Sequence, residues 1–129
     1  MSTDLKYLAL TAILTASLWI PYVIAQVRIN GPLTPQNYSD PTPRALPLWG
    51  KRADRTYINA VETFAPFAAL VIVAHLAGKA DATAFWATSF FWLRLAHAVV
   101  YLLGIPYVRT LIFTLGYVAI VGIFWEVIR

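Results

Sequence analysis

Three polar residues in an otherwise apolar stretch have the spacing of one helix face. Arg55, Asn59 and Glu62 are separated by four and three residues, and residues three or four apart lie on the same side of an α-helix. Guanidinium groups form paired hydrogen bonds with carboxylates and phosphates. This face is therefore a candidate for recognition of a small anion.

A second polar triplet, Arg94, His97 and Tyr101, has intervals of three and four residues and also predicts one helix face. Arg28 and Arg109 stand at the ends of neighbouring apolar stretches. A lone histidine is more often a satisfied core residue than a catalyst, and arginines at helix ends commonly extend to lipid headgroups. Each charge within a bilayer costs a few kcal/mol and needs a partner or a function.

The charges of this set do not balance. Four arginines, at positions 28, 55, 94 and 109, face one carboxylate, Glu62. A purely structural Glu62–Arg94 pair would hold two helices together, yet structural pairing tends towards neutrality. A surplus of three positive charges therefore favours an anionic ligand over helix pairing alone.

The chain that positions these residues is composed like a membrane protein. Of its 129 residues, 60% are hydrophobic and only 12% are charged, against about 25% charged residues in an ordinary soluble domain. It has no cysteine, which excludes a disulfide scaffold and any thiolate of its own. The basic residues lie mostly at helix ends and in one loop, so the net charge of +4 predicts no nucleic-acid partner. We also expect no metal site.

Four apolar stretches are long enough to span a bilayer, and they predict helices over about residues 5–27, 55–77, 82–103 and 106–127. The first is longer than the core of a cleaved signal peptide and is expected to remain as a span. Five prolines predict an irregular loop over residues 28–54. We therefore expect one domain over residues 1–129, an all-α bundle of four transmembrane helices. His75 has no polar neighbour on its own helix face and is predicted to be structural or interfacial.

Basic residues predict the orientation, because positively charged loops remain in the cytoplasm. Six lie on the side of the proline-rich loop: Arg28, Arg44, Lys51, Arg52, Arg55 and Arg109. Three lie on the other side: Lys6, Lys79 and Arg129. The loop is therefore expected in the cytoplasm, with both termini on the opposite side.

The same residues resemble motifs of the MAPEG family, the membrane-associated proteins of eicosanoid and glutathione metabolism. The similar segments are Gln26-Val27-Arg28, Arg52-x-x-Arg55-x-x-x-Asn59-x-x-Glu62 with Pro66-Phe67, Arg94-x-x-His97-x-x-x-Tyr101-Leu102, and Pro106-x-x-Arg109. Each segment is short, and their order on four helices makes the combination specific.

The resemblance implies a glutathione site between the subunits of a homotrimer, open to the cytoplasm. In glutathione-binding relatives the site is lined by the positions that match Arg28, Arg55, Asn59, Glu62, Arg94, His97, Tyr101 and Arg109. Lys51 and Thr56 depart from the family pattern. Ile58 and Phe113 also depart from it, because they replace an arginine and a tyrosine of microsomal prostaglandin E synthase, a member of the family. The last two departures weaken the case for prostaglandin synthesis more than the case for glutathione binding.

Glutathione, as a co-substrate, would react as its thiolate, and a free thiol has a pKa of about 8.5. Arg109, at the start of the fourth helix, is the expected thiolate stabiliser, because its charge adds to the positive end of the helix. Thr110 is expected to donate a hydrogen bond to the sulfur. The implied activity is a transferase or peroxidase reaction on a lipophilic substrate that enters from the lipid. Two alternatives remain: a non-catalytic lipid-binding or scaffold member of the family, and a small four-helix exporter of cationic drugs, which would need a more acidic pocket.

Overall fold

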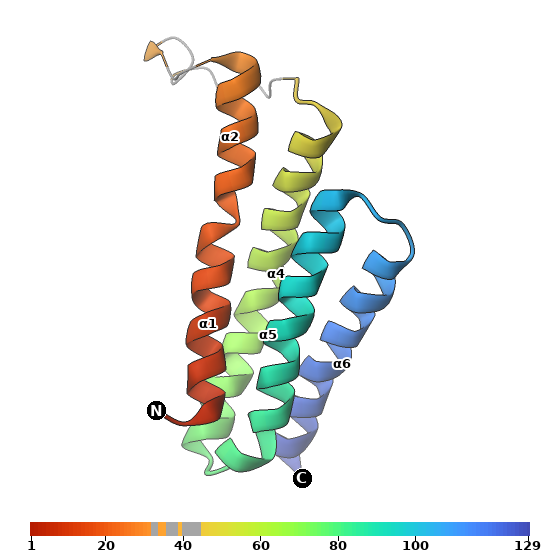
Figure 1. The fold of residues 1–129 in the computed structure, drawn as a ribbon. Helices are drawn as coiled ribbons and strands as arrows, with labels where there is room; N and C mark the ends of the chain where they lie inside the picture. Colours follow the sequence, from red (N-terminus) through yellow and green to blue (C-terminus); the bar gives the residue numbers. More distant parts are fainter. Residues whose placement is uncertain (32–33, 36–38, 40–44) are drawn as a thin grey trace.

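The computed structural model describes residues 1–31, 34–35, 39 and 45–129. It consists of helices in an antiparallel bundle, drawn in Figure 1. They are α1 (Thr3–Ser17), α2 (Trp19–Asn30), α4 (Leu48–Leu76), α5 (Ala80–Leu103) and α6 (Val108–Ile128). Both termini and the α4–α5 turn lie at one end, and the α5–α6 turn lies at the other.

Four helical segments are long and apolar enough to cross a membrane: Thr3–Asn30, Leu48–Leu76, Ala80–Leu103 and Val108–Ile128. The predicted all-α architecture with four membrane-spanning helices is therefore confirmed. At most 28% of any span is buried within the protomer. Apolar side chains such as Leu76, Phe85 and Trp125 are consequently exposed on the outside of the bundle, where lipid contacts them.

The first span is interrupted between α1 and α2. The residue between them, Leu18, donates its N–H to Thr15 O at 3.3 Å, in a tighter turn than an α-helix makes. The cause is Pro21, which has no N–H to offer to the carbonyl of Ser17 four residues earlier. Within the turn before the break, the Ser17 hydroxyl donates to Ile13 O at 2.8 Å. The expected single helix is therefore two helices in line.

The second span begins at Leu48 rather than near residue 55, which corrects the predicted loop boundary of residues 28–54. Pro47 precedes its first residue with an extended backbone, and no proline follows until Pro66. The prolines predict a loop over the whole segment, which includes Lys51, Arg52 and Asp54, but the last of the five prolines is Pro47. Charge limits how far a segment enters the bilayer but does not end a helix, so α4 extends beyond its apolar part. Arg44, counted above for the orientation, lies outside the described residues.

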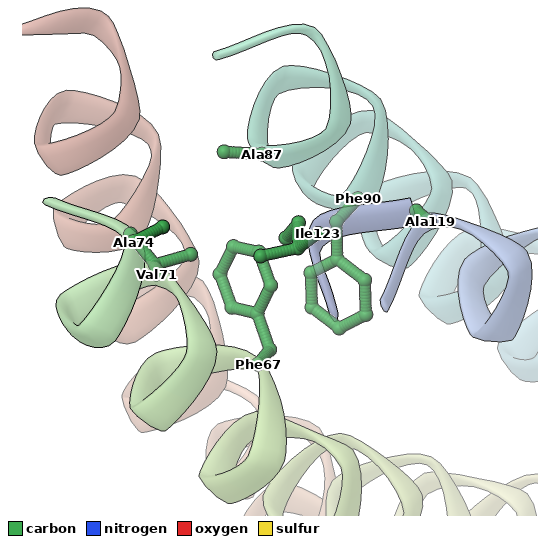
Figure 2. Close-up of a cluster of buried hydrophobic side chains, with 7 residues drawn as sticks. All are labelled: Phe67, Val71, Ala74, Ala87, Phe90, Ala119 and Ile123. Atoms are coloured by element: carbon green, nitrogen blue, oxygen red, sulfur yellow. The ribbon is translucent and has the colours of Figure 1, made fainter. Parts of the chain in front are cut away.

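The core lies between α4, α5 and α6, as Figure 2 shows. Its buried side chains are Phe67, Val71, Ala74, Ala87, Phe90, Ala119 and Ile123. The Phe67 and Phe90 rings stack with their centroids 4.0 Å apart. A Cβ at Gly122 would come within 2.4 Å of Trp86, so this glycine allows α6 to pack closely on α5.

Candidate functional site

The site residues gather where α5 ends and α6 begins. Gly104 ends α5 in the left-handed region, with a φ of 74°, and its N–H donates to Tyr101 O at 3.0 Å. Glycine adopts this conformation without the steric cost that other residues incur. The chain then reverses direction, and Tyr107 precedes the first residue of α6, Val108. This tight reversal places the first turn of α6 beside the last turns of α5.

A pocket of about 250 Å³ lies at this reversal. It is lined by Asn59, His97, Tyr101, Arg109, Thr110 and Phe113. Five of these six are predicted site residues, and they come from three different helices. The structure therefore brings together α4, α5 and α6 residues that the sequence could group only by their spacing along each helix.

The walls of the pocket combine aromatic rings with one guanidinium group. The Arg109 Cζ lies 4.6 Å from the centroid of the Tyr101 ring, within the range of a cation–π contact. The His97 ring is buried, and its centroid lies 5.6 Å from that of Tyr101 and 5.8 Å from that of Phe113. His97 Nδ1 has no hydrogen-bond partner in the described part of the chain. This arrangement places Arg109 at the pocket, and no anionic side chain among the described residues pairs with it.

Arg94 lies behind this pocket rather than in its wall. It is only 5% exposed and lines a smaller hollow of about 40 Å³, together with Thr63, Phe90, Phe113, Gly116, Tyr117 and Ile120. The Arg94 Cζ is 6.0 Å from the centroid of Phe113, and Phe113 contributes to both spaces. No carboxylate pairs with Arg94 among the described residues. Arg94 is therefore a buried cation beside the pocket, with Phe113 in the lining of both spaces.

Three predicted site residues, Arg28, Arg55 and Glu62, are exposed and are absent from the described lining of either space. No ion pair within the described residues joins Glu62 to Arg94. The structural Glu62–Arg94 pair considered from the sequence is therefore not formed within one protomer.

Phe113 is the lining residue that the sequence reasoning left out of the site. It stands four residues after Arg109 on α6, and side chains four residues apart on a helix are neighbours. The spacing from Arg109 is the sequence signal that places Phe113 in the pocket, although Phe113 differs from the tyrosine at the matching position of the family pattern.

His75 lies at the opposite end of the bundle and has a partner there. Its Nδ1 is 3.0 Å from Asp4 Oδ2, and Asp4 is buried. The predicted structural role of His75 agrees with this contact. Its partner was missed because 71 residues separate the two along the chain. Within the described segments, no group of three or more His, Cys, Asp or Glu side chains could hold a metal ion.

Comparison with known proteins gives one family. The model of the MAPEG family matches residues 5–129, which is almost the whole chain. No curated protein matches the sequence. No solved structure matches it either.

Proposed function

The chain belongs to the MAPEG family, and we propose that it is a glutathione-dependent transferase or peroxidase that acts on a lipophilic substrate. Membership supports a membrane role in glutathione-related transferase or isomerase chemistry in general. The four membrane-spanning helices make it an integral, multi-pass membrane protein in contact with lipid. The specific reaction and the site residues are inferred from the pocket.

The observation that carries the proposal is the unmatched positive charge at the pocket. Arg109 lines it and Arg94 lies just behind it, while no carboxylate belongs to the described lining. Glutathione has two carboxylates and one ammonium group, and its reactive form adds a thiolate. An anion of this kind supplies the charge that the pocket lacks.

Arg109 is proposed to stabilise the thiolate, with Thr110 as its helper. Both residues belong to the first turn of α6, where backbone N–H groups lack intrahelical acceptors and the helix dipole is positive. The Thr110 side chain is exposed at the pocket, so its hydroxyl is free to donate to sulfur. Charge and hydrogen bonds that favour the ionised form lower the pKa of a bound thiol.

The remaining site residues are proposed to bind the rest of glutathione. Asn59, His97 and Tyr101 offer polar groups within the pocket, and Arg94 adds charge from behind Phe113. Glu62 is assigned to the ammonium group, and Arg28 and Arg55 to the carboxylates.

A homotrimer would make this assignment possible. Glu62 is exposed on a membrane-spanning helix without a partner among the described residues, and an isolated charge facing lipid is costly. A second copy against α4 would remove it from lipid and bring it to a shared site. The excess of basic residues near the loop supports a site open to the cytoplasm, with both termini on the opposite side.

A thermal-shift titration of the detergent-purified protein tests the proposal. Glutathione at one hundred times its Kd should stabilise the protein by about 2.7 kcal/mol, and S-hexylglutathione should do the same. The isomer Glu-Cys-Gly, which lacks the γ-glutamyl linkage, is the matched control and should have a much smaller effect.

Three results would overturn parts of the proposal. No stabilisation by glutathione would exclude the binding site. Stabilisation without thiolate formation, or stabilisation by phospholipid alone, would indicate the non-catalytic alternative. Uptake of cationic drugs into vesicles along a pH gradient would instead indicate the exporter.

A further inference from the structure

Arg52 connects the start of α4 to the end of α5. Its Nε donates to Leu102 O at 3.2 Å, across 50 residues of sequence. In a continuing helix this carbonyl would accept the N–H of residue 106, but that residue is a proline and has no N–H. Arg52 therefore satisfies a carbonyl for which the chain offers no α-helical backbone donor. Its positive charge also lies at the negative end of the α5 dipole.

Arg52 also packs on the turn that follows. A Cβ on Gly104 would lie 3.1 Å from both Cζ and Nε of Arg52. Glycine at this position thus serves two purposes, because it adopts a positive φ and it leaves room for the guanidinium group. The guanidinium group donates to the Leu102 carbonyl and lies against the side of Gly104 where a Cβ would be.

This turn determines where the proposed catalytic groups stand. Tyr101 immediately precedes Leu102, and α6 begins four residues after Gly104 with Val108, next to Arg109. A shift of the turn would change the 4.6 Å contact between Arg109 and the Tyr101 ring. Arg52 is itself absent from the described lining of the pocket, so it can affect the thiol through this turn or through its charge. The variant Arg52→Lys retains the charge and separates the two.

We propose that Arg52 is a positioning residue, which holds the α5–α6 turn so that Arg109 and Thr110 face the pocket. The part that concerns the thiolate rests on the proposed function. The anchoring of the turn stands on the geometry alone. The two parts are tested separately on the full-length protein in detergent.

The first test is hydrogen–deuterium exchange without ligand, on Arg52→Ala, Arg52→Lys and the control Lys51→Ala. Lys51 is an exposed neighbour on the same turn of α4, so its removal costs the same charge. In Arg52→Ala, the amides of residues 101–105, which are hydrogen-bonded at the end of α5, should exchange about tenfold faster, equivalent to about 1.4 kcal/mol for the lost hydrogen bond, while the core of α4 remains as in the parent. Arg52→Lys should restore part of the protection. Parent-like exchange in residues 101–105, or an equal increase in all helices, would overturn the proposal.

The second test is the ultraviolet absorbance of the thiolate, titrated with pH at saturating glutathione. Arg52→Ala should raise the pKa of the bound thiol by about half a unit and change Kd less than threefold, whereas Lys51→Ala should change neither. A role limited to global stability would leave the thiol pKa unchanged, and that result would overturn the positioning of Arg109. A parent protein that binds no glutathione would refute the proposed function, and the exchange experiment would still decide whether Arg52 anchors the turn.

Discussion

The two ends of the bundle differ in whether their charged side chains have partners of opposite charge. At the end that holds the termini (Figure 1), Asp4 lies 3.0 Å from His75, and Glu126 lies 2.9 Å from Arg129. Lys79 Nζ also donates to the backbone carbonyl of Arg129 at 3.3 Å. These contacts form within one protomer. The Asp4–His75 contact connects α1 to α4, and the Lys79–Arg129 hydrogen bond connects the α4–α5 turn to the end of α6.

At the other end, the charged residues of the site have no ion-pair partner within the part of the chain that the structure describes. Arg94 and Arg109 lie in or behind the pocket without a carboxylate, and Glu62 is exposed without a cation, among the described residues. Buried charge is costly unless it is compensated. The end that holds the termini, called the matched end, has ion pairs that stabilise the protomer. At the opposite end, called the unmatched end, a ligand or another copy of the chain must supply the opposite charges. Substitutions at the two ends should therefore affect different measurements.

The largest effect is expected at the matched end. His75→Phe leaves the buried Asp4 carboxylate without its donor, and Asp4 Oδ1 already lacks a partner in the described part. Only the Asp4 side of this contact is buried, since the His75 side chain is 37% exposed. Loss of the partner of a buried carboxylate costs about 3 kcal/mol. Unfolding in mixed micelles should show this loss, with glutathione affinity changed less than twofold. The double variant Asp4→Leu/His75→Phe should regain most of the stability. A single variant as stable as the parent would show that the pair is not structural.

The next effect is expected in binding. Glu62→Gln should weaken glutathione binding about thirtyfold, equivalent to about 2 kcal/mol for a lost charge-assisted hydrogen bond. Protomer stability should remain close to that of the parent, because Glu62 has no ion pair in the described chain. Isothermal titration calorimetry measures the affinity, with Glu126→Gln as the matched control. Unchanged affinity would remove Glu62 from the site.

A smaller effect is expected on the pKa of the bound thiol, which separates stabilisation of the thiolate from binding of glutathione. Arg109→Ser should raise the pKa of the bound thiol by about one unit, equivalent to about 1.4 kcal/mol, with less effect on Kd. Arg109→Lys retains the charge, so the pKa of the bound thiol should remain close to that of the parent. Thiolate absorbance titrated with pH measures both variants. Coincident curves for the parent and Arg109→Ser would assign this arginine to anchoring alone.

The smallest effect is expected for the ion pair at the end of α6. Arg129 is largely exposed, and pairs of this kind contribute less than about 0.5 kcal/mol. Glu126→Gln should therefore leave both the unfolding free energy and glutathione binding nearly unchanged. A loss comparable with that of His75→Phe would mean that the C-terminal end is buried in the assembly.

Several features of the fold and site were readable from local patterns. The four spans follow from the lengths of the apolar stretches. Helical spacing predicts that Asn59 lies on the same helix face as Glu62, and that His97 lies on the same face as Tyr101. Five of the six pocket residues were named on this basis, together with the family motifs. The start of α4 at Leu48 was not readable, because apolarity marks the limits of the bilayer and not those of the helix.

By itself, the sequence determined the membrane class, the number of spans and the polar faces of the helices, since each depends on residues within a few turns of one another. The tertiary structure alone decided which of those faces meet. It paired Asp4 with His75 and Arg52 with Leu102, placed Phe113 beside His97, and left Arg94 behind the pocket. These contacts join residues far apart in the chain, and they depend on how the helices pack and on the geometry of the α5–α6 turn. Helical spacing predicts the face of a side chain but not the residue that faces it from another helix.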